Sequence, residues 1–407
     1  MRARNDGRAA AGAGGGPGRR AACVALVALL PLVAAAATPA KKAAVPPELE
    51  RETLTTAAIA AEAKERVYVA DIAISHISDG RIRVFDARGG RFLGMISTAY
   101  AGNFTVSDKR DEVYVATSHL SRSTRGDRTD VLEVYDTGNL AFKYEVVLPP
   151  KRAQALNYRG LVRASGDGRF VLVQNATPAT SITVVDLAGR KVVNEIATPG
   201  CWGILPAASH GARLSMLCGD GTVATYTLDG GGQVTDKQVS PKLFDPDNDA
   251  WFHHAEQVGD RYWFVSFQGR LTELDLGGAS PRVSSERWLV DEAQKKQGWR
   301  PGGYQNFAVD PTARWLVLGM HAKGSEGSHK RPAQQLWVFD LGAGKRVATA
   351  PGHGTVSLTF SRSGQRLNAL DGETGALRTW QFSAGALKPL AVVTSAGEAP
   401  LHLESHD

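Results

Sequence analysis

Four carboxylates in the middle of the chain have the spacing of a calcium-binding loop. They match its first, third, fifth and twelfth positions, and they are Asp245, Asp247, Asp249 and Glu256. The loop also requires a glycine at its sixth position, where this chain has Ala250, and flanking helices, which the sequence does not indicate. We therefore expect a solvated acidic loop and no metal site, and keep a self-sufficient calcium-dependent enzyme as a rival hypothesis.

Two adjacent histidines, His253 and His254, are the other candidate metal ligands. Adjacent residues on a strand point to opposite faces, so we expect one buried and one exposed imidazole. The sequence contains no HExxH, CxxC, GxSxG or Walker A pattern, the motifs of metal, redox, hydrolase and phosphate sites. We expect no catalytic residue in this chain. If it belongs to an enzyme, the reactive group lies elsewhere.

Two cysteines flank a predicted hairpin. The strands GCWGIL and RLSMLC surround a turn near Ser209 and His210, which places Cys201 opposite Cys218. Opposite Cα atoms in an antiparallel pair lie about 4.5–5.5 Å apart, within the reach of a disulfide. We predict this bond, and two buried thiols are the alternative.

The first forty residues have the features of a secretory leader. Five arginines precede an apolar run at 21–37, and small residues follow it. The run is short for a membrane span, so residues 1–40 are predicted to be cleaved, leaving no membrane span in the mature chain; Arg19 and Arg20 leave twin-arginine export open. Residues 41–51 are predicted to be a linker or tail. Without the leader the net charge falls from +6 to +2, and no basic stripe remains to indicate a nucleic-acid partner.

A two-strand signature repeated seven times provides the scaffold. Each copy has a β-rich run near an arginine, as in RVYVAD from Arg66, and a second run that often closes on an aspartate, as in IRVFD to Asp86. Antiparallel repeats about fifty residues apart are typical of a β-propeller. The sequence thus predicts an all-β fold over 52–407, a seven-bladed β-propeller with four-stranded antiparallel blades. The strand-end aspartates are expected to form turns.

Further segments predict how the ring closes and where it binds. RFLGMIS (91–97) is predicted to be an outer strand and GNFTVSD (102–108) the inner strand of the next blade. The C-terminal tail repeats this order, so it is predicted to complete a blade begun at the N-terminus. The polar insertions at 118–130, 286–306 and 321–333 are predicted to be loops where a partner binds.

Six segments resemble the heavy chain of quinoprotein amine dehydrogenases, the aromatic amine dehydrogenase branch more closely than the methylamine dehydrogenase branch. They lie at residues 148–189, TRGDRTDVLEVYD (124–136), GCWGILP (200–206), CGDGT (218–222), GWRPGGYQ (298–305) and GSHKRPA (327–333).

The resemblance implies a periplasmic assembly of two heavy and two light chains, in which the heavy chain is a seven-bladed propeller. The light chain carries tryptophan tryptophylquinone, which takes two electrons from a primary amine, releasing aldehyde and ammonia. The electrons pass singly to a small azurin- or amicyanin-like copper protein. This chain is too long and too poor in cysteine to be the light chain. It is therefore expected to be the non-catalytic large subunit, acting on arylalkyl amines; the alternative is a stand-alone, partner-binding propeller with no enzymatic role.

The resemblance also places one residue. The family has an aromatic residue at the mouth of the substrate channel, in a loop before an inner strand, and in STAYAGNFTV this residue is Tyr100. The family residue is phenylalanine, so the hydroxyl of Tyr100 leaves the amine preference open. The alternative is that Tyr100 only packs between blades.

Overall fold

The computed structural model describes residues 57–72, 74–154 and 158–406. The chain divides into two compact units, Met1–Leu54 and Thr55–Asp407, and all the described residues lie in the second. The predicted leader (1–40) and linker (41–51) fall outside the described residues. Helices in the described part are few and short: α1 (Glu292–Lys296) and the 3₁₀ helices η1 (Ile74–Asp79), η2 (Arg159–Leu161) and η3 (Ser328–Lys330).

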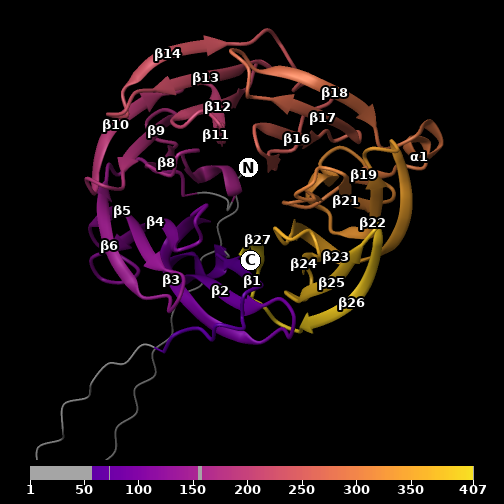
Figure 1. Cartoon of the computed structure of the whole chain (residues 1–407), viewed down its shortest axis with the longest axis horizontal. Coiled ribbons are helices and arrows are strands. Elements are labelled where there is room, and N and C mark those ends of the chain that lie inside the picture. The colour runs from indigo at the N-terminus through magenta and orange to yellow at the C-terminus, as the bar shows by residue number, and fades with distance from the viewer. Residues whose placement is uncertain (1–56, 73, 155–157, 407) are drawn as a thin grey trace, which may run out of the picture. The chain divides into compact units, whose positions relative to one another are not determined.

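The described strands pair in five sheets, which Figure 1 shows arranged around a ring. The first has the order β27-β1-β2-β3-β4-β5-β6, with β1 (Arg66–Asp71), β2 (Gly80–Asp86), β3 (Phe92–Val106), β4 (Glu112–Leu120), β5 (Arg128–Asp136), β6 (Phe142–Leu148) and β27 (Pro400–His406). The second contains β7 (Val162–Ala164), β8 (Phe170–Asn175), β9 (Ser181–Asp186) and β10 (Lys191–Ala197). The third contains β11 (Cys201–Pro206), β12 (Arg213–Cys218), β13 (Val223–Leu228) and β14 (Val234–Val239).

The fourth sheet contains β15 (Glu256–Val258), β16 (Arg261–Val265), β17 (Arg270–Asp275) and β18 (Arg282–Trp288). The fifth contains β19 (Arg300–Pro301), β20 (Phe307–Val309), β21 (Trp315–His321), β22 (Ala333–Asp340), β23 (Lys345–Phe360), β24 (Arg366–Asp371), β25 (Leu377–Ser383) and β26 (Ala386–Val393). All the described sheets are antiparallel, as the repeat predicts.

Two strands are long enough to pair with two neighbouring groups of strands. In β3, residues 92–99 pair with β2 and residues 100–106 with β4. In β23, residues 345–351 pair with β22 and residues 357–360 with β24, and Thr355 pairs with both. The first and last sheets are larger than the others for this reason. The outer and inner strands predicted at 91–97 and 102–108 are both present, but they are continuous.

The C-terminal strand β27 pairs with β1 along its length, from Arg66 opposite His406 to Asp71 opposite Pro400. Gln305, just before β20, adds a second tie, because its side-chain amide bonds both the backbone N–H (2.6 Å) and the backbone carbonyl (3.1 Å) of Leu403. The prediction that the tail completes the group of strands begun at the N-terminus is confirmed.

The apolar core of the described residues consists of seven clusters, each lying between two neighbouring groups of strands. In β1, for example, Val67 and Val69 belong to one cluster while Tyr68 and Ala70 belong to the next. Successive side chains of a strand point to opposite faces of its sheet. Both faces of each sheet are therefore buried against a neighbour, which explains the near-continuous apolar runs of the repeat.

The strand-end aspartates form turns. In each case a carboxylate oxygen accepts a backbone N–H two or three residues later: Asp86 from Arg88 (3.1 Å), Asp136 from Gly138 (2.7 Å), Asp186 from Gly189 (3.2 Å), Asp275 from Gly277 (2.9 Å) and Asp340 from Ala343 (2.9 Å). The turn-forming role predicted for them is confirmed.

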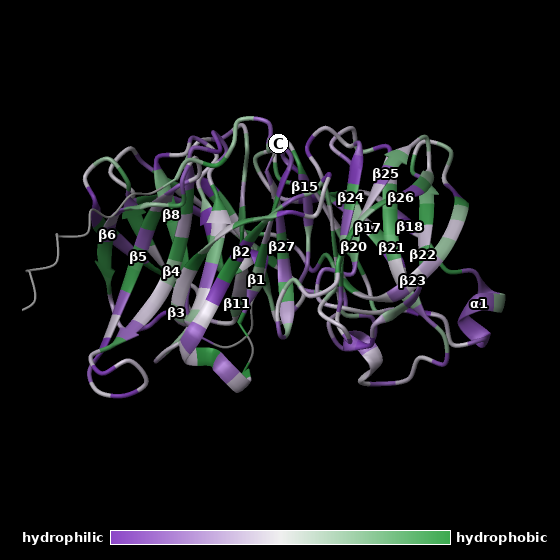
Figure 2. Ribbon diagram, turned by 90° about the horizontal axis from the view of Figure 1, so that it is seen from below, coloured by the Kyte–Doolittle hydropathy of each residue, from purple (hydrophilic) through white to green (hydrophobic). Residues whose placement is uncertain are grey.

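The polar insertions are built into the ends of the sheets. Residues 118–130 extend the β4–β5 hairpin, whose pairing continues to Leu120 opposite Arg128. The insertion at 286–306 contains α1, and the one at 321–333 contains η3. In Figure 2, α1 lies toward the lower edge of the ring and the C-terminus at the upper edge.

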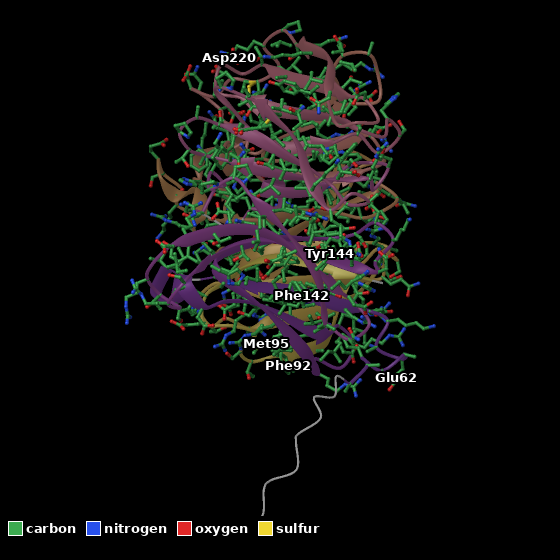
Figure 3. The ribbon with its side chains drawn as sticks, turned by 90° about the vertical axis from the view of Figure 1, so that its left-hand side faces the viewer. Glu62, Phe92, Met95, Phe142, Tyr144 and Asp220 are labelled. Atoms are coloured by element: carbon green, nitrogen blue, oxygen red, sulfur yellow. A yellow bond between two sulfur atoms is a disulfide. The ribbon has the colours of Figure 1, made fainter. Side chains whose placement is uncertain are left out.

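The outer strands expose several apolar side chains. Phe92 and Met95 of β3 and Phe142 of β6 are 53 %, 49 % and 53 % exposed, and Figure 3 shows them on one side of the ring. Phe92 and Phe142 pack edge to face against Phe85 and Tyr135 of the adjacent strands, with ring centroids 5.7 and 5.8 Å apart. These rings therefore extend the packing of their own sheets to the outer edge.

Candidate substrate-channel and docking face

The connections that lead into the innermost strands lie at one end of the ring. Four antiparallel strands return the chain to the end where it began, so successive inner strands all start from that end. We call it the loop end, and the opposite end, where each inner strand turns back, the turn end. Tyr100, Tyr158, Cys201, His253 and Tyr304 all lie at or shortly before the start of an inner strand. Tyr100, the residue that the family resemblance points to, is thus at the same end of the ring as the two cysteines.

Tyr100 opens the inner half of β3, where it lies opposite Ser118 of β4. It is half-buried, and it belongs to none of the seven apolar clusters of the described residues. Its neighbours Ala99 and Ala101 have φ angles of 42° and 49°. A left-handed backbone costs a residue other than glycine about 1–2 kcal/mol, so this segment is held in its shape by surrounding contacts.

A buried arginine supplies those contacts. Arg152, in the connection that follows β6, is 3 % exposed. Its guanidinium donates to the carbonyl of Tyr100, to the carbonyl of Ala101 (2.8 Å) and to the hydroxyl of Ser118 (3.0 Å). Because Arg152 also forms an isolated β-bridge with Asn175 of β8, it ties the strained segment to the neighbouring group of strands.

The charge of Arg152 is balanced through Ser118 and Asp130. The Ser118 hydroxyl donates to Asp130 Oδ1 (2.6 Å), and Asp130, 1 % exposed, is also held by Arg128 (2.6 Å). Burial lowers the pKa of Arg152 to about 10, against the opposing effect of the Asp130 carboxylate. The guanidinium thus stays protonated at neutral pH, and all three of its nitrogens donate hydrogen bonds.

A cavity of about 380 Å³ opens at the loop end, and its wall combines several aromatic rings with polar side chains such as Asp247 and Asn248. Tyr158, Phe252, Phe267 and Tyr304 line it, and the insertion at 321–333 adds Glu326, His329 and Lys330. The ammonium of Lys330 lies 5.8 Å from the centroid of the Tyr304 ring. Two of the three predicted binding insertions thus contribute to one cavity.

Neither of the adjacent histidines is exposed, so the prediction of one exposed imidazole was wrong, whereas the prediction of one buried imidazole is confirmed by His254. His253 is half-buried with an inaccessible Nε2 atom, and its ring meets the Tyr158 ring at a centroid distance of 5.0 Å. The His254 side chain is 1 % exposed, and its Nε2 lies 2.9 Å from the carbonyl of Phe307 and 3.0 Å from Glu256 Oε1. The two residues precede β15 rather than lying on a strand, so the strand alternation does not apply. Burial, and then the neighbouring His254, lower the pKa of His253 to about 4.

Three of the four carboxylates of the calcium pattern have separate partners. Asp245 accepts the N–H of Asp247 (3.2 Å) within its own turn, Asp249 accepts the N–H of Gln268 (2.9 Å), and Glu256 pairs with Arg159 (3.1 Å). Across the described ranges, no group of three or more His, Cys, Asp or Glu side chains could hold a metal ion.

The turn end contains a second cavity, of about 340 Å³, with charged walls. Arg159 and Glu256 form one ion pair in it. Glu404, 5 % exposed, accepts the N–H of Val106 (2.9 Å) and lies 3.6 Å from His402 Nε2. Burial alone would raise the pKa of Glu404, but the contact with His402 and the charge of Arg159 lower it to about 2. This end therefore holds an ionised carboxylate inside the ring.

Cys201 and Cys218 are opposite each other in the β11–β12 pair and are bonded, with Cα atoms 3.9 Å apart. The register of this pair shifts by one residue between Trp202 and Leu205. Gly203 lies in this bulge with a φ of 81°, and a Cβ there would lie 2.6 Å from the His253 ring. The bulge therefore sets both the cysteine register and the space for His253.

Sequence reasoning did not single out Arg152, Asp130 or the ring-lining Tyr158 and Tyr304. Arg152 follows the pair of prolines at 149–150 and has no distinguishing pattern, and its partner Tyr100 is 52 residues away. Tyr304 lies in an insertion that was predicted to bind a partner. The sequence therefore indicated that this region is exposed for binding, but not that the Tyr304 ring lines the cavity.

No helix among the described residues is long and apolar enough to cross a membrane. The described fold is similar to a periplasmic gluconolactonase of Pseudomonas aeruginosa (TM-score 0.59, 16 % identity, 84 % of this chain and 99 % of that chain). It is also similar to a putative 6-phosphogluconolactonase of Bacteroides fragilis (TM-score 0.59, 10 % identity, 85 % of this chain and 99 % of that chain). At these identities the likeness concerns the fold alone.

The sequence comparisons are more specific. The methylamine dehydrogenase heavy chain of Methylophilus methylotrophus is 26 % identical over 357 residues, which are 87 % of this chain and 86 % of the relative. The methylamine dehydrogenase heavy chain of Paracoccus versutus is 27 % identical over 331 residues, 80 % of this chain and 75 % of the relative. The family model described as methylamine dehydrogenase heavy chain (MADH) matches residues 62–407. This chain therefore belongs to the methylamine dehydrogenase heavy chain family.

Proposed function

We propose that this chain is the non-catalytic large subunit of a periplasmic quinoprotein amine dehydrogenase, which oxidises primary amines to aldehyde and ammonia. The observation that carries the proposal is the family match over residues 62–407. The subunit would act with a cysteine-rich light chain in a heterotetramer of two heavy and two light chains. A small copper protein of the azurin or amicyanin type would accept the electrons.

The cofactor of this assembly, tryptophan tryptophylquinone, accepts two electrons from the amine, and we place it on the light chain. One pair of tryptophans in this chain lies ring against ring, and this pair does not fit the group. Trp299 and Trp337 lie with ring centroids 5.3 Å apart, but Trp337 is 1 % exposed and packs in an apolar cluster. A substrate has no route to it, so the role of this chain is to bind the light chain and enclose the amine.

We place the light chain on the loop end of the ring. Tyr100, the aromatic cavity and the insertions at 286–306 and 321–333 all lie there. The turns of the opposite end are short, as in the five-residue connection 107–111 between β3 and β4. Insertions on a rigid scaffold are where binding residues concentrate, which favours the loop end as the docking surface.

We further propose that the preferred amines are arylalkyl amines. The relatives are named for methylamine, so this step rests on Tyr100 and the aromatic walls of the loop-end cavity. Aromatic rings gain about 0.5–1.5 kcal/mol from edge-to-face contact beyond simple burial. A ring at the channel mouth would therefore favour a substrate that carries a ring of its own.

The strand pairing of the described sheets is best explained by seven blades. Splitting β3 and β23 at the residues where they change partners leaves seven groups of strands, and seven apolar clusters separate them. We propose that this seven-bladed propeller spans 52–407, preceded by a secretory leader at 1–40 and a linker at 41–51, and that the leader directs the chain to the periplasm.

The test is activity with and without the light chain. We expect the chain expressed alone to fold but to give no amine-dependent dye reduction, and the complex purified from the native host to show a visible quinone band that a primary amine bleaches. Turnover by the isolated chain would contradict the non-catalytic role. Purification without any light chain would favour the stand-alone propeller.

A further inference from the structure

The backbone around Tyr100 is held in a conformation that its own sequence does not favour. Ala99 and Ala101, on either side of Tyr100, both have positive φ angles of 42° and 49°. Glycine is the residue that adopts this conformation without steric cost, and Gly102 follows only after the strained residues. Strained backbone persists only where surrounding structure determines it, and it concentrates at functional sites.

Arg152 forms an isolated β-bridge with Asn175 of β8, in the next group of strands, and its side chain reaches back to this segment and to β4. Its three guanidinium nitrogens bond the Tyr100 carbonyl, the Ala101 carbonyl (2.8 Å) and the Ser118 hydroxyl (3.0 Å). Ser118 lies opposite Tyr100 in β4. The arginine thus holds the backbone of Tyr100 and also holds β4, the strand with which Tyr100 pairs.

We propose that Arg152 is a positioning residue for Tyr100, setting where its ring lies at the channel mouth and hence the preference for aromatic over small amines. The inference rests on the proposed function. Arg152 itself does not contact the substrate. It acts through the backbone carbonyls of residues 100 and 101, which fix the direction in which the Tyr100 side chain leaves the strand.

The geometry calls for arginine rather than any cation. A planar guanidinium presents donors in fixed directions, whereas the ammonium of lysine is a single flexible point. Arg152→Lys would keep the charge next to Asp130 but could not bond two successive carbonyls and Ser118 together. Its effect therefore separates positioning from charge balance.

The chain offers a matched control at the other end of the ring. Arg213 also reaches from one group of strands to the next, where it donates to the carbonyls of Leu276 (2.6 Å) and Gly278. Arg213 follows the turn after β11, at the turn end, so Arg213→Lys removes a contact of the same kind far from Tyr100.

The experiment uses the complete heavy and light chain complex and compares kcat/KM for phenylethylamine with kcat/KM for methylamine. We expect Arg152→Lys to lower this ratio about fivefold, chiefly by raising KM for phenylethylamine, as expected for a loss of about 1 kcal/mol of ring contact. Arg213→Lys should leave the ratio within twofold of wild type. The double variant Arg152→Lys/Tyr100→Ala should be no worse than Tyr100→Ala, because the two changes remove the same contact.

Ser118→Ala provides a second variant if Arg152→Lys does not assemble, since it removes one of the three anchors and should shift the ratio less in the same direction. If the assembled Arg152→Lys or Ser118→Ala enzyme kept the wild-type ratio of kcat/KM values while Tyr100→Ala lowered it, that result would overturn the positioning role alone. An unchanged ratio in Tyr100→Ala would remove Tyr100 from the channel and the inference with it. A wild-type complex without amine turnover would instead overturn the proposed function.

Discussion

The two ends of the ring have cavities of similar size, about 380 Å³ at the loop end and 340 Å³ at the turn end, but with different walls: the loop-end wall contains several aromatic rings, and the turn-end wall contains more charged side chains. The loop end has an uncharged, half-buried His253 beside the aromatic rings and a strained segment around Tyr100. The turn end has ion pairs and an ionised Glu404. The same strands connect both ends, so the difference comes from the connections: the long segments 240–255, 289–306 and 322–332 lie at the loop end, whereas connections out of the inner strands, such as 107–111, are short.

The two ends are also stabilised differently. The loop end is tied by the Cys201–Cys218 bond and by the buried guanidinium of Arg152. The turn end relies on hydrogen-bonded turns such as that of Ser107 and Asp111 (2.9 Å) and on the carbonyl contacts of Arg213. A surface that must hold an aromatic ring in place for a partner benefits from the more rigid construction.

The largest expected effect comes from removing the covalent tie of the loop end. Replacing both Cys201 and Cys218 by serine should lower the free energy of unfolding by about 3 kcal/mol, as expected for a loop of this size. Each group of strands mainly contacts its neighbours, so the loss should be strongest near the third sheet. Denaturant unfolding measures the total, and hydrogen exchange locates it. Two titratable thiols in the unreduced, denatured wild type would contradict the bond.

Acid should affect the two ends in different pH ranges. The pKa of His253 is lowered from its ordinary 6.5 to about 4, so the unfolded chain binds that proton first and stability falls as pH drops from about 6.5 to 4, by up to ~1.4 kcal/mol per pH unit. The pKa of Glu404 is lowered from 4.5 to about 2, so its stabilising contribution is present above pH 4.5 and is lost between 4.5 and 2.

Unfolding by urea across this pH series tests the separation. His253→Gln should flatten the dependence between pH 6.5 and 4, while Glu404→Gln should flatten it only below 4.5. If the pH dependence of stability above pH 4.5 were the same in His253→Gln as in the wild type, the His253 imidazole would have to be protonated in the folded wild-type chain.

Charge reversal at each end tests which one binds the light chain. Lys330 and Arg362 are exposed cations beside the loop-end and turn-end cavities. We expect Lys330→Glu to weaken light-chain binding about tenfold, or ~1.4 kcal/mol, and Arg362→Glu to leave it unchanged. Titration of one chain with the other measures both, and the reverse order of effects would move the docking surface to the turn end.

The smallest expected effect concerns substrate preference. Tyr100→Ala should reduce kcat/KM for arylalkyl amines by about fivefold relative to small aliphatic amines, since ring contact contributes about 1 kcal/mol. A residue that only packs between blades would lower stability and leave the preference unchanged, so thermal unfolding of the same variant separates the two roles.

Much of the scaffold is determined by the sequence alone. The alternation and spacing of the repeats predicted antiparallel strands, the aspartates such as Asp86 and Asp136 formed the expected turns, and the C-terminal tail closed the ring on β1. These features depend on residues close in sequence, or on a repeat that recurs in every copy, so local physical rules are sufficient to predict them.

The tertiary structure decided the chemistry of the two ends. Only folding brings Arg152 to Tyr100, packs the half-buried His253 against Tyr158, buries His254, and separates the carboxylates of an apparent calcium loop. The bulge at Gly203 likewise sets the register of Cys201 and Cys218. These outcomes depend on side chains from different groups of strands that meet only when the ring is formed, and a single sequence has no local signal for such meetings.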